Sequence, residues 1–210
     1  MSKEYTTEEI QQAANNIRKH VLRLTIERNG CYLSQACSSA ELLATMYLKV
    51  LNLSESQAPK LPEKFPGTPS KDNMDYIQGA DYHGSLKAPY DRFFISPAHY
   101  AAPVYAALIE AGRLAEDSLE MFNRDGYSME MIGANHTPGF ENAAGTLDQA
   151  ISVAGGTAHA RKLRGEEGRV FVMMSDGEMQ EGQLWEAIQA AAFYKLDNLV
   201  LSSGCERPAS

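Results

Sequence analysis

Cysteine is scarce in this sequence, and its three copies form no recognisable pattern. Cys31, Cys37 and Cys205 are odd in number and show no Cys-x-x-Cys spacing. A scaffold held by disulfides and a zinc site built from closely spaced thiolates are therefore not expected. Unpaired thiols are typical of a reducing compartment, so we predict a cytoplasmic protein.

Long apolar runs are missing as well. No stretch approaches the roughly 20 apolar residues that a membrane-spanning helix needs, and the polar start Met1-Ser2-Lys3-Glu4 lacks the pattern of a secretory signal. The sequence also shows no internal repeat and no low-complexity tract. We therefore expect no membrane partner.

Positive charge is in deficit. The chain has 19 Lys and Arg against 27 Asp and Glu, a formal net charge of -8. This excess of acid opposes binding to phosphate backbones, so nucleic acid is not an expected partner. The 210 residues, 44% of them hydrophobic, suffice to bury a core. We predict a single domain over residues 1–210.

The most informative stretch contains a strand, a turn, a helix and a second strand. An apolar run at 170–174, flanked by Gly168 and Gly177, is typical of a strand that is buried on both faces. Apolar residues recur at helical spacing over 183–195, and a second apolar run follows at 199–201. The pattern predicts an α/β fold with a parallel sheet.

Asp176 lies just after the first of these strands. Open parallel sheets hold ligands at the carboxyl ends of their strands, and Gly177 allows close approach of the backbone. A carboxylate suits Mg²⁺, which bridges to phosphate oxygens. The alternative interpretation is that Asp-Gly forms only a tight turn.

His99 occupies a similar place after another predicted strand, at 91–96. The helix that follows runs to Glu110, so the imidazole lies at a helix amino end. The helix dipole there favours a neutral ring, which can donate a hydrogen bond to a phosphate or a reacting oxygen. Capping or packing is the alternative role for this histidine. His136 and His159 are expected to be structural or surface groups.

Two further helices are predicted from capping boxes. Thr6 with Glu9 opens a helix that ends near Asn29-Gly30, and Ser38 with Glu41 opens a second one. Residues 54–91, with five prolines and several glycines among charges, are expected to form an extended, solvated loop. A cover over the site is the alternative for this loop, and His83 within it receives no role.

Several motifs resemble those of transketolases. The string Asp-Gly-Glu-Met-Gln-Glu-Gly-Gln-Leu-Trp-Glu-Ala at 176–187 is similar to their thiamine diphosphate motif, most closely to that of the separate amino-terminal subunit of two-subunit transketolases. Asp-Arg-Phe-x-x-Ser-x-x-His at 91–99, Pro-Gly-x-Glu at 138–141 and Gly-x-Leu at 145–147 also match. The resemblance extends from Thr6 to Leu199. It implies a thiamine-diphosphate-binding fold, with helices flanking a parallel sheet.

The resemblance also implies cofactors and residue roles. The cofactors are thiamine diphosphate and Mg²⁺, with Asp176 as a metal ligand. The residues expected to contact the cofactor are His99, Gly145, Thr146, Leu147, Asp176, Gly177 and Glu178. His99 would also move protons at substrate oxygens, and Glu181 would connect to the carboxylate of the partner that activates the cofactor. From the residue alone, Glu181 is an acid at a helix start.

The implied reaction is transfer of a two-carbon ketol unit from a ketose or ketose phosphate to an aldose or aldose phosphate. The implied partner is a carboxyl-terminal, pyrimidine-binding transketolase subunit, in a homo- or hetero-oligomer. Sugar phosphates would be the substrates.

The sequence departs from the family at several positions. Tyr32 and Met131 replace histidines, and Asp148 and Ala150 replace glycines of the Gly-x-Leu-Gly-Gln-Gly motif. The Asp-x-Asn turn after the last strand is missing, and Glu206 falls near the place of its asparagine. The domain is thus expected to be incomplete at its carboxyl end, and a truncated or frame-shifted gene is the simplest account.

These departures leave two alternatives open. The first is a catalytically inactive subunit that acts only through partner binding. The second is a related thiamine diphosphate enzyme, such as a relative of deoxyxylulose-phosphate synthase.

Overall fold

The computed structural model describes residues 4–28 and 33–204. Tyr32, Glu206 and the predicted Asn29-Gly30 end of the first helix lie outside the described residues. None of the helices in the described part is long and apolar enough to cross a membrane.

Three parallel strands form the centre of the molecule. They are β1 (Arg92–Ile95), β2 (Val170–Ser175) and β3 (Leu199–Gly204), in the order β1-β2-β3. The register places Phe94 opposite Val172, which in turn lies opposite Leu201. Every residue of β2 is buried, as its continuous apolar run predicted. The predicted α/β class with a parallel sheet is therefore confirmed.

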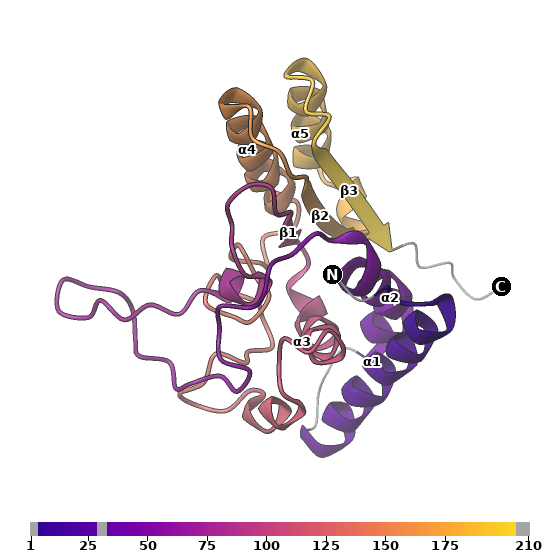
Figure 1. The fold of residues 1–210 in the computed structure, drawn as a ribbon, viewed down its shortest axis with the longest axis vertical. Coiled ribbons are helices and arrows are strands. Elements are labelled where there is room, and N and C mark those ends of the chain that lie inside the picture. The colour runs from indigo at the N-terminus through magenta and orange to yellow at the C-terminus, as the bar shows by residue number, and fades with distance from the viewer. Residues whose placement is uncertain (1–3, 29–32, 205–210) are drawn as a thin grey trace.

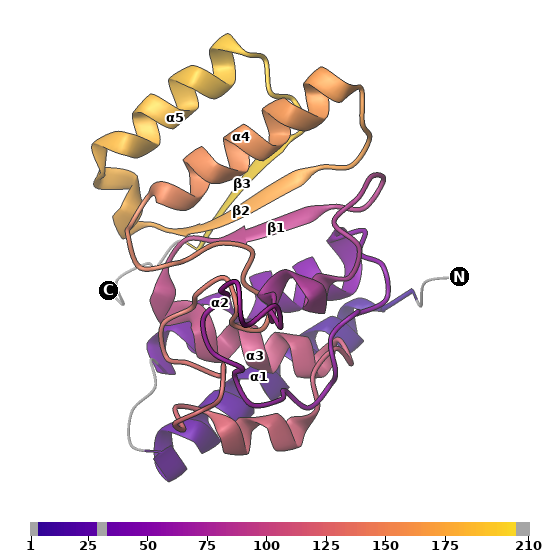
Figure 2. The same cartoon turned by 90° about the vertical axis from the view of Figure 1, so that its left-hand side faces the viewer.

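Helices cover both faces of this sheet (Figure 2). One layer contains α4 (Gln149–Arg164) and α5 (Gly182–Phe193), and the opposite layer contains α1 (Thr7–Arg28), α2 (Leu33–Thr45) and α3 (Ala101–Glu110). A π-helical turn at Met46–Val50 extends α2. Short 3-10 helices occupy Gly79–His83, Ala98–Tyr100, Glu116–Met121 and Gly177–Gln180.

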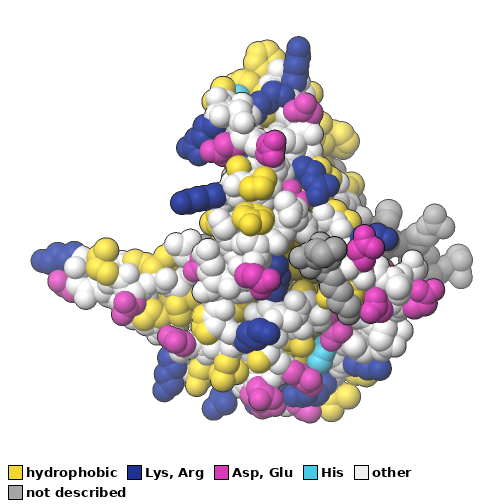
Figure 3. All heavy atoms as spheres, in the orientation of Figure 1, with side chains coloured by type: hydrophobic (Ala, Val, Ile, Leu, Met, Phe, Trp, Pro, Cys, Tyr) yellow, Lys and Arg dark blue, Asp and Glu magenta, His cyan; other side chains and the backbone are white. Residues whose placement is uncertain are grey.

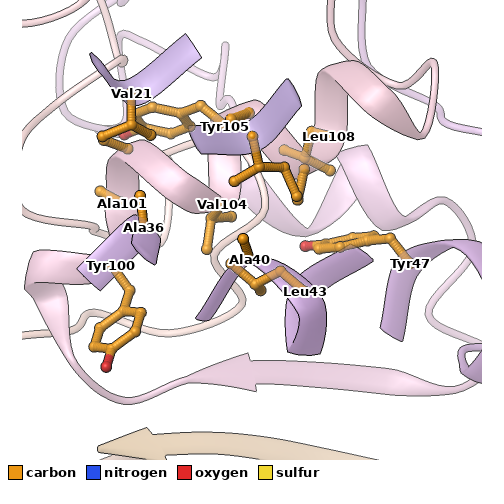
Figure 4. Packing of buried hydrophobic residues seen from close by; sticks show 14 of the residues in the cluster. Val21, Ala36, Ala40, Leu43, Tyr47, Tyr100, Ala101, Val104, Tyr105 and Leu108 are labelled. Carbon is orange, nitrogen blue, oxygen red and sulfur yellow. The ribbon is translucent and has the colours of Figure 1, made fainter. Parts of the chain in front are cut away.

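The strands divide their side chains between two cores because successive residues point to opposite faces. Phe93 and Met173 belong to the core on the side of α1, α2 and α3, whereas Phe94 and Val172 belong to the core under α4 and α5. Figure 4 shows the first core, where α3 packs against α1 and α2. Small side chains such as Ala36 and Ala40 of α2 are fully buried there and allow the helices to approach closely.

The two predicted capping boxes have different outcomes. In the first, the Thr6 N–H donates to Glu9 Oε2 at 2.9 Å and the Glu9 N–H donates to Thr6 Oγ1 at 3.2 Å, which confirms the start of α1. The second prediction is wrong, because α2 begins five residues earlier, at Leu33. Ser38 lies inside the helix, where its hydroxyl donates to the Gln35 carbonyl at 3.3 Å.

Most of the 54–91 segment is irregular, and its middle projects from the body of the molecule (Figure 1). Exposed apolar side chains such as Leu61 and Met74 lie between charged ones, a mixture visible on the projection in Figure 3. The end of the segment differs, because Tyr82 and His83 are buried. The prediction of a solvated loop is therefore wrong for Gly79–His83.

His83 anchors this part of the segment. Its Nε2 lies 2.9 Å from the Tyr47 hydroxyl and its Nδ1 lies 2.9 Å from Glu141 Oε1. Glu141 also accepts from the Phe93 N–H at 2.9 Å and pairs with Arg92. This buried network ties the segment to the π-helical turn after α2, to β1 and to the Pro-Gly-x-Glu motif.

Candidate functional site

Three segments meet at the carboxyl edge of the sheet. They are the end of β1 with its following turn, the residues before α4, and the turn after β2. Glu178 joins all three, since its Oε1 accepts from Ser96 Oγ at 2.5 Å and from the Asp148 N–H at 3.1 Å. Its Oε2 accepts from the Ser175 N–H at 2.8 Å and from Ser175 Oγ at 3.2 Å. The structure therefore brings the predicted motifs together around one carboxylate.

Glu178 itself is 0% exposed. The sequence analysis placed it among the cofactor contacts, but the structure turns its side chain into the protein, where four donated hydrogen bonds compensate for its burial. The role that these contacts support is to position the surrounding turns. A backbone contact to a cofactor stays a prediction.

Asp176 is half-buried and begins the turn after β2. Its Oδ1 accepts from the Gly177 N–H at 2.9 Å, which closes the local bend that the alternative interpretation proposed. Within the described residues its Oδ2 has no hydrogen-bond partner. One carboxylate oxygen therefore stabilises the turn, and the other can serve a ligand.

His99 lies in the 3-10 helix that directly follows β1, and α3 begins two residues later. Its half-exposed ring packs against Tyr100 with 5.0 Å between centroids. Gly145 lies beside this turn, because a methyl group on it would be 3.8 Å from the Ala98 Cβ. The histidine and the Gly-x-Leu motif are thus neighbours in space.

The remaining predicted residues are exposed: Gly145, Thr146, Leu147, Gly177 and Glu181. Gly145 has a φ of +112°, a left-handed conformation that favours glycine. Glu181 occupies the position before α5 without a side-chain capping bond. These exposed residues and Asp176 form an accessible surface beside Glu178, which we call the rim.

Asp148 points away from this rim. Its φ is +73°, and its Oδ2 accepts from the Leu184 N–H in the first turn of α5 at 2.5 Å. Burial raises the pKa of Asp148, and the nearby Glu178 and Glu181 raise it further, whereas the hydrogen bond from Leu184 lowers it. The Asp148 side chain therefore does not narrow the site. Ala150 is also buried.

Sequence reasoning missed the groups that assemble the site. Ser96 directly follows β1 and Ser175 ends β2, and both hydroxyls donate to Glu178. Asp148 caps α5 from a distance of 36 residues along the chain. The repeated serine at the strand ends was a usable signal, whereas the capping contact of Asp148 depends on the packing of α4 against α5.

The residues at the rim fit the implied cofactors in part. Mg²⁺ is commonly held by one or two carboxylates together with phosphate oxygens and water. Asp176 has a free oxygen for this purpose, and the exposed backbone of Gly145, Thr146, Leu147 and Gly177 can approach a ligand. The described residues contain no group of three or more His, Cys, Asp or Glu that would hold a metal ion by itself. A metal here would therefore depend on ligands from the cofactor.

His136 and His159 contact neighbouring side chains away from the rim. His136 Nε2 lies 2.9 Å from Glu130 Oε1 and its ring stacks on Phe65. The His159 ring lies edge to face with Tyr194, at 4.4 Å between centroids, beside an apolar cavity between α4 and α5. Neither lies in the three segments that Glu178 joins.

Comparison with known proteins identifies the family. The family model described as transketolase, thiamine diphosphate binding domain, matches residues 85–202, more than half of the chain. A transketolase family protein of Sinorhizobium fredii is 35% identical over 192 residues, which cover 91% of this chain and 59% of the relative. An apulose-4-phosphate transketolase subunit of Actinobacillus succinogenes is 30% identical, with 92% and 61% covered.

Solved structures agree on the fold. Transketolase from Leishmania mexicana superimposes with a TM-score of 0.70 at 24% identity, covering 92% of this chain and 27% of that chain. The chain thus spans about three-fifths of the two bacterial relatives and about a quarter of the solved enzyme. The residues that the family model matches include β1, β2 and the turns that build the rim. The chain therefore belongs to the transketolase family.

Proposed function

We propose that this chain is the amino-terminal, thiamine-diphosphate-binding subunit of a two-subunit transketolase. The reaction would be Mg²⁺-dependent transfer of a two-carbon ketol unit from a ketose or its phosphate to an aldose or its phosphate. The observation that carries the proposal is the joining of three family motifs by Glu178 at the carboxyl edge of a parallel sheet.

Different residues of the rim would bind Mg²⁺ and thiamine diphosphate. Asp176 would provide Oδ2 to Mg²⁺ while Oδ1 keeps the turn closed. Gly145, Thr146, Leu147 and Gly177 would line the cofactor with exposed backbone. When bound, thiamine diphosphate supplies the nucleophilic carbon and the electron sink that cleavage of a carbon-carbon bond requires.

His99 would hold and move a proton at the substrate oxygens. Its position at the amino end of α3 favours a neutral imidazole, which donates with one nitrogen and accepts with the other. Its ring is half-exposed and lies in the turn that Gly145 contacts. General acid-base catalysis needs a group of this kind within hydrogen-bonding reach of the substrate.

The proposed partner is a pyrimidine-binding transketolase subunit. The Actinobacillus relative is itself named as one subunit of a transketolase, which supports a two-subunit arrangement. Glu181 is exposed and has no capping bond to its own helix, so it is available to a group of the partner. We propose it as the link to the carboxylate that activates the cofactor.

The second candidate is an inactive subunit that acts through partner binding alone. It is favoured by Tyr32 and Met131, which stand where the family has histidines. The two candidates differ in whether the assembled complex turns over substrate.

Co-expression with a pyrimidine-binding subunit tests the proposal. The purified complex is assayed for ketol transfer from ketose phosphates, with and without thiamine diphosphate and Mg²⁺. We expect transfer that needs both additions and that falls by about 100-fold in Asp176→Asn, comparable to the loss of one transition-state contact. The matched control is Asp125→Asn, an exposed acid in another loop, which should keep full activity. A complex that forms but transfers nothing would establish the inactive alternative.

A further inference from the structure

A cavity lies beside α4 at the end of the sheet where β1 begins. Its volume is about 350 Å³, within the range of about 300–1,000 Å³ that is usual for small-molecule sites. One face of α4, from Val153 to Arg164, lines it together with Arg92, which is the first residue of β1. The rim lies at the opposite, carboxyl ends of the strands, and the cavity shares no residue with it.

Positive charge dominates this cavity. Arg92, Arg161 and Arg164 line it, and Glu166 is the single acid among the residues of its lining. Arg161 and Arg164 are three positions apart, so they lie on the same face of α4. Glu166 Oε1 lies 3.7 Å from Arg164 Nη1. In a chain with a formal net charge of -8, three arginines around one cavity reverse the overall sign locally.

Arg161 is a buried cation without a carboxylate partner in the described part of the chain. The residue is 3% exposed. Its Nη1 donates to the Tyr90 carbonyl at 2.8 Å, and its Nη2 donates to the Leu86 carbonyl at 3.0 Å. These carbonyls satisfy the N–H groups but leave the charge uncompensated. A buried charge of this kind is costly, so an anion in the cavity would stabilise it.

Arg92 adds to the positive potential at Arg161. Burial lowers the pKa of Arg161, and the charge of Arg92 lowers it further, whereas more weakly acting acids raise it: Glu166, Glu141 and Asp91. The two guanidinium groups are therefore within electrostatic reach of each other. An anion that contacts Arg92 in this cavity also interacts with the charge of Arg161.

Part of the Arg92 guanidinium is available to a ligand. Its Nε pairs with the buried Glu141, and its Cζ lies 5.4 Å from the centre of the Phe94 ring, which hold the group in place. Within the described residues Nη1 and Nη2 have no hydrogen-bond partner, and neither nitrogen is buried. Arg92 therefore presents two held donors at the cavity that it lines.

A phosphoryl group matches these donors. A phosphate monoester carries a charge of about -1.5 to -2 at neutral pH and has three acceptor oxygens. The planar fork of arginine binds phosphate through two parallel hydrogen bonds. Because the arginines come from two elements, β1 and α4, a tetrahedral group can accept from both, whereas the two oxygens of a carboxylate lie in one plane. Leu86, Val153 and Ala160 provide apolar wall for a small organic part.

We propose that this cavity binds the phosphoryl group of a small phosphate monoester. Arg92 and Arg164 would donate to its oxygens, and Arg161 would contribute its charge from the wall. The organic part would pack against Leu86 and Val153. The site is independent of the proposed transketolase reaction, because it lies at the other end of the strands.

Three probes test the preference for charge and for an ester by isothermal titration calorimetry on the full chain at constant ionic strength. They are propyl phosphate, its diester methyl propyl phosphate, which carries one charge, and inorganic phosphate. We expect saturable binding of propyl phosphate and at least tenfold weaker binding of the other two. No saturable binding of propyl phosphate, or equal affinity for the monoester and the diester, would overturn the proposal. Inorganic phosphate binding as tightly as propyl phosphate would overturn the assignment to an ester, with free phosphate as the ligand.

Variants then assign the contacts. Arg164→Gln should weaken binding of propyl phosphate by about tenfold, the loss of one charge-assisted hydrogen bond. Lys162→Gln is the matched control, because it removes the same charge from the same turn of α4 but lies outside the cavity, and it should bind as the original chain does. Equal effects of these two variants would contradict the site.

Arg92→Lys keeps a positive charge beside Glu141 but removes the two free donors. It should also weaken binding of propyl phosphate by about tenfold. Unchanged binding by this variant would exclude Arg92 from the site. Should Arg92→Lys fail to fold, the comparison of Arg164→Gln with Lys162→Gln decides alone, since the Arg164 side chain is 70% exposed and its replacement leaves the core intact.

Discussion

At the scale of single residues, the Glu178 carboxylate connects the segments that form the candidate site. One buried carboxylate accepts hydrogen bonds from the ends of two strands and from the start of α4. The sequence analysis expected Glu178 to contact the cofactor, but the hydrogen bonds of its side chain are made within the protein. Asp176, two positions earlier, has one carboxylate oxygen without a hydrogen-bond partner in the described part of the chain, and this oxygen is the one proposed to bind Mg²⁺.

Replacing Glu178 with Gln tests this role. The amide nitrogen of Gln cannot accept a hydrogen bond, so the variant leaves either the Ser175 N–H or the Asp148 N–H without its acceptor, whereas the serine hydroxyls can turn and accept from the amide. We expect the free energy of unfolding, measured by urea denaturation, to fall by about 1–3 kcal/mol. Glu181→Gln is the matched control, because that side chain is exposed and should change stability by less than about 0.5 kcal/mol. Equal stability of the two variants would show that Glu178 does not hold the turns together.

At the scale of elements, prediction succeeded where the signal was local. The buried run of β2 and the capping box of α1 are complete within a few residues, and both formed as expected. The start of α2 was missed because the same Ser-x-x-Glu pattern also fits inside a helix, where Ser38 bonds to the preceding turn. The burial of His83 was missed because its partner Glu141 lies 58 residues away.

The same distinction between local and long-range signals applies to the candidate site. The turns after β1 and β2 were placed correctly, since parallel strands end at one edge. The contact between Asp148 and α5 was beyond prediction, because it depends on how two helices pack.

The capping of α5 by Asp148 gives a pH-dependent prediction. Because burial raises the pKa of Asp148, the folded state retains a proton that the unfolded state releases as the pH rises above the ordinary pKa of 3.8. Ionisation of Asp148 therefore costs stability above that pH. Asparagine keeps an oxygen for the Leu184 N–H and tolerates a positive φ, but it carries no charge.

We therefore expect the stability of Asp148→Asn relative to the original chain to increase as the pH rises above 3.8, the ordinary pKa of the aspartate side chain. Urea denaturation at several pH values measures this difference. Asp197→Asn is the control, because its hydrogen bond from Lys162 lowers the pKa of Asp197, so the stability of this variant relative to the original chain should fall as the pH rises towards 3.8 and should level off above that pH. A difference for Asp148→Asn that stays constant with pH would mean that the carboxylate ionises as in the unfolded chain.

At the scale of the whole molecule, the rim is accessible and would supply only part of the proposed binding site. In the described residues Asp176 is the single carboxylate predicted to contact the metal, and the backbone around it is exposed. The remaining enclosure of a cofactor would come from the proposed pyrimidine-binding partner. Affinity for thiamine diphosphate should therefore belong to the complex, because a half-enclosed ligand stays largely hydrated and gains little from electrostatic contacts in water.

Calorimetric titration with thiamine diphosphate and Mg²⁺ measures this dependence. The chain alone should bind weakly or not at all, whereas its complex with the partner should bind at least tenfold more tightly. Asp176→Asn in the complex should lose most of that gain, since the variant removes the charge proposed to face Mg²⁺, and Asp125→Asn should retain it. Micromolar binding by the chain alone would show that these 210 residues already enclose the cofactor, and the role assigned to the partner would then be limited to catalysis.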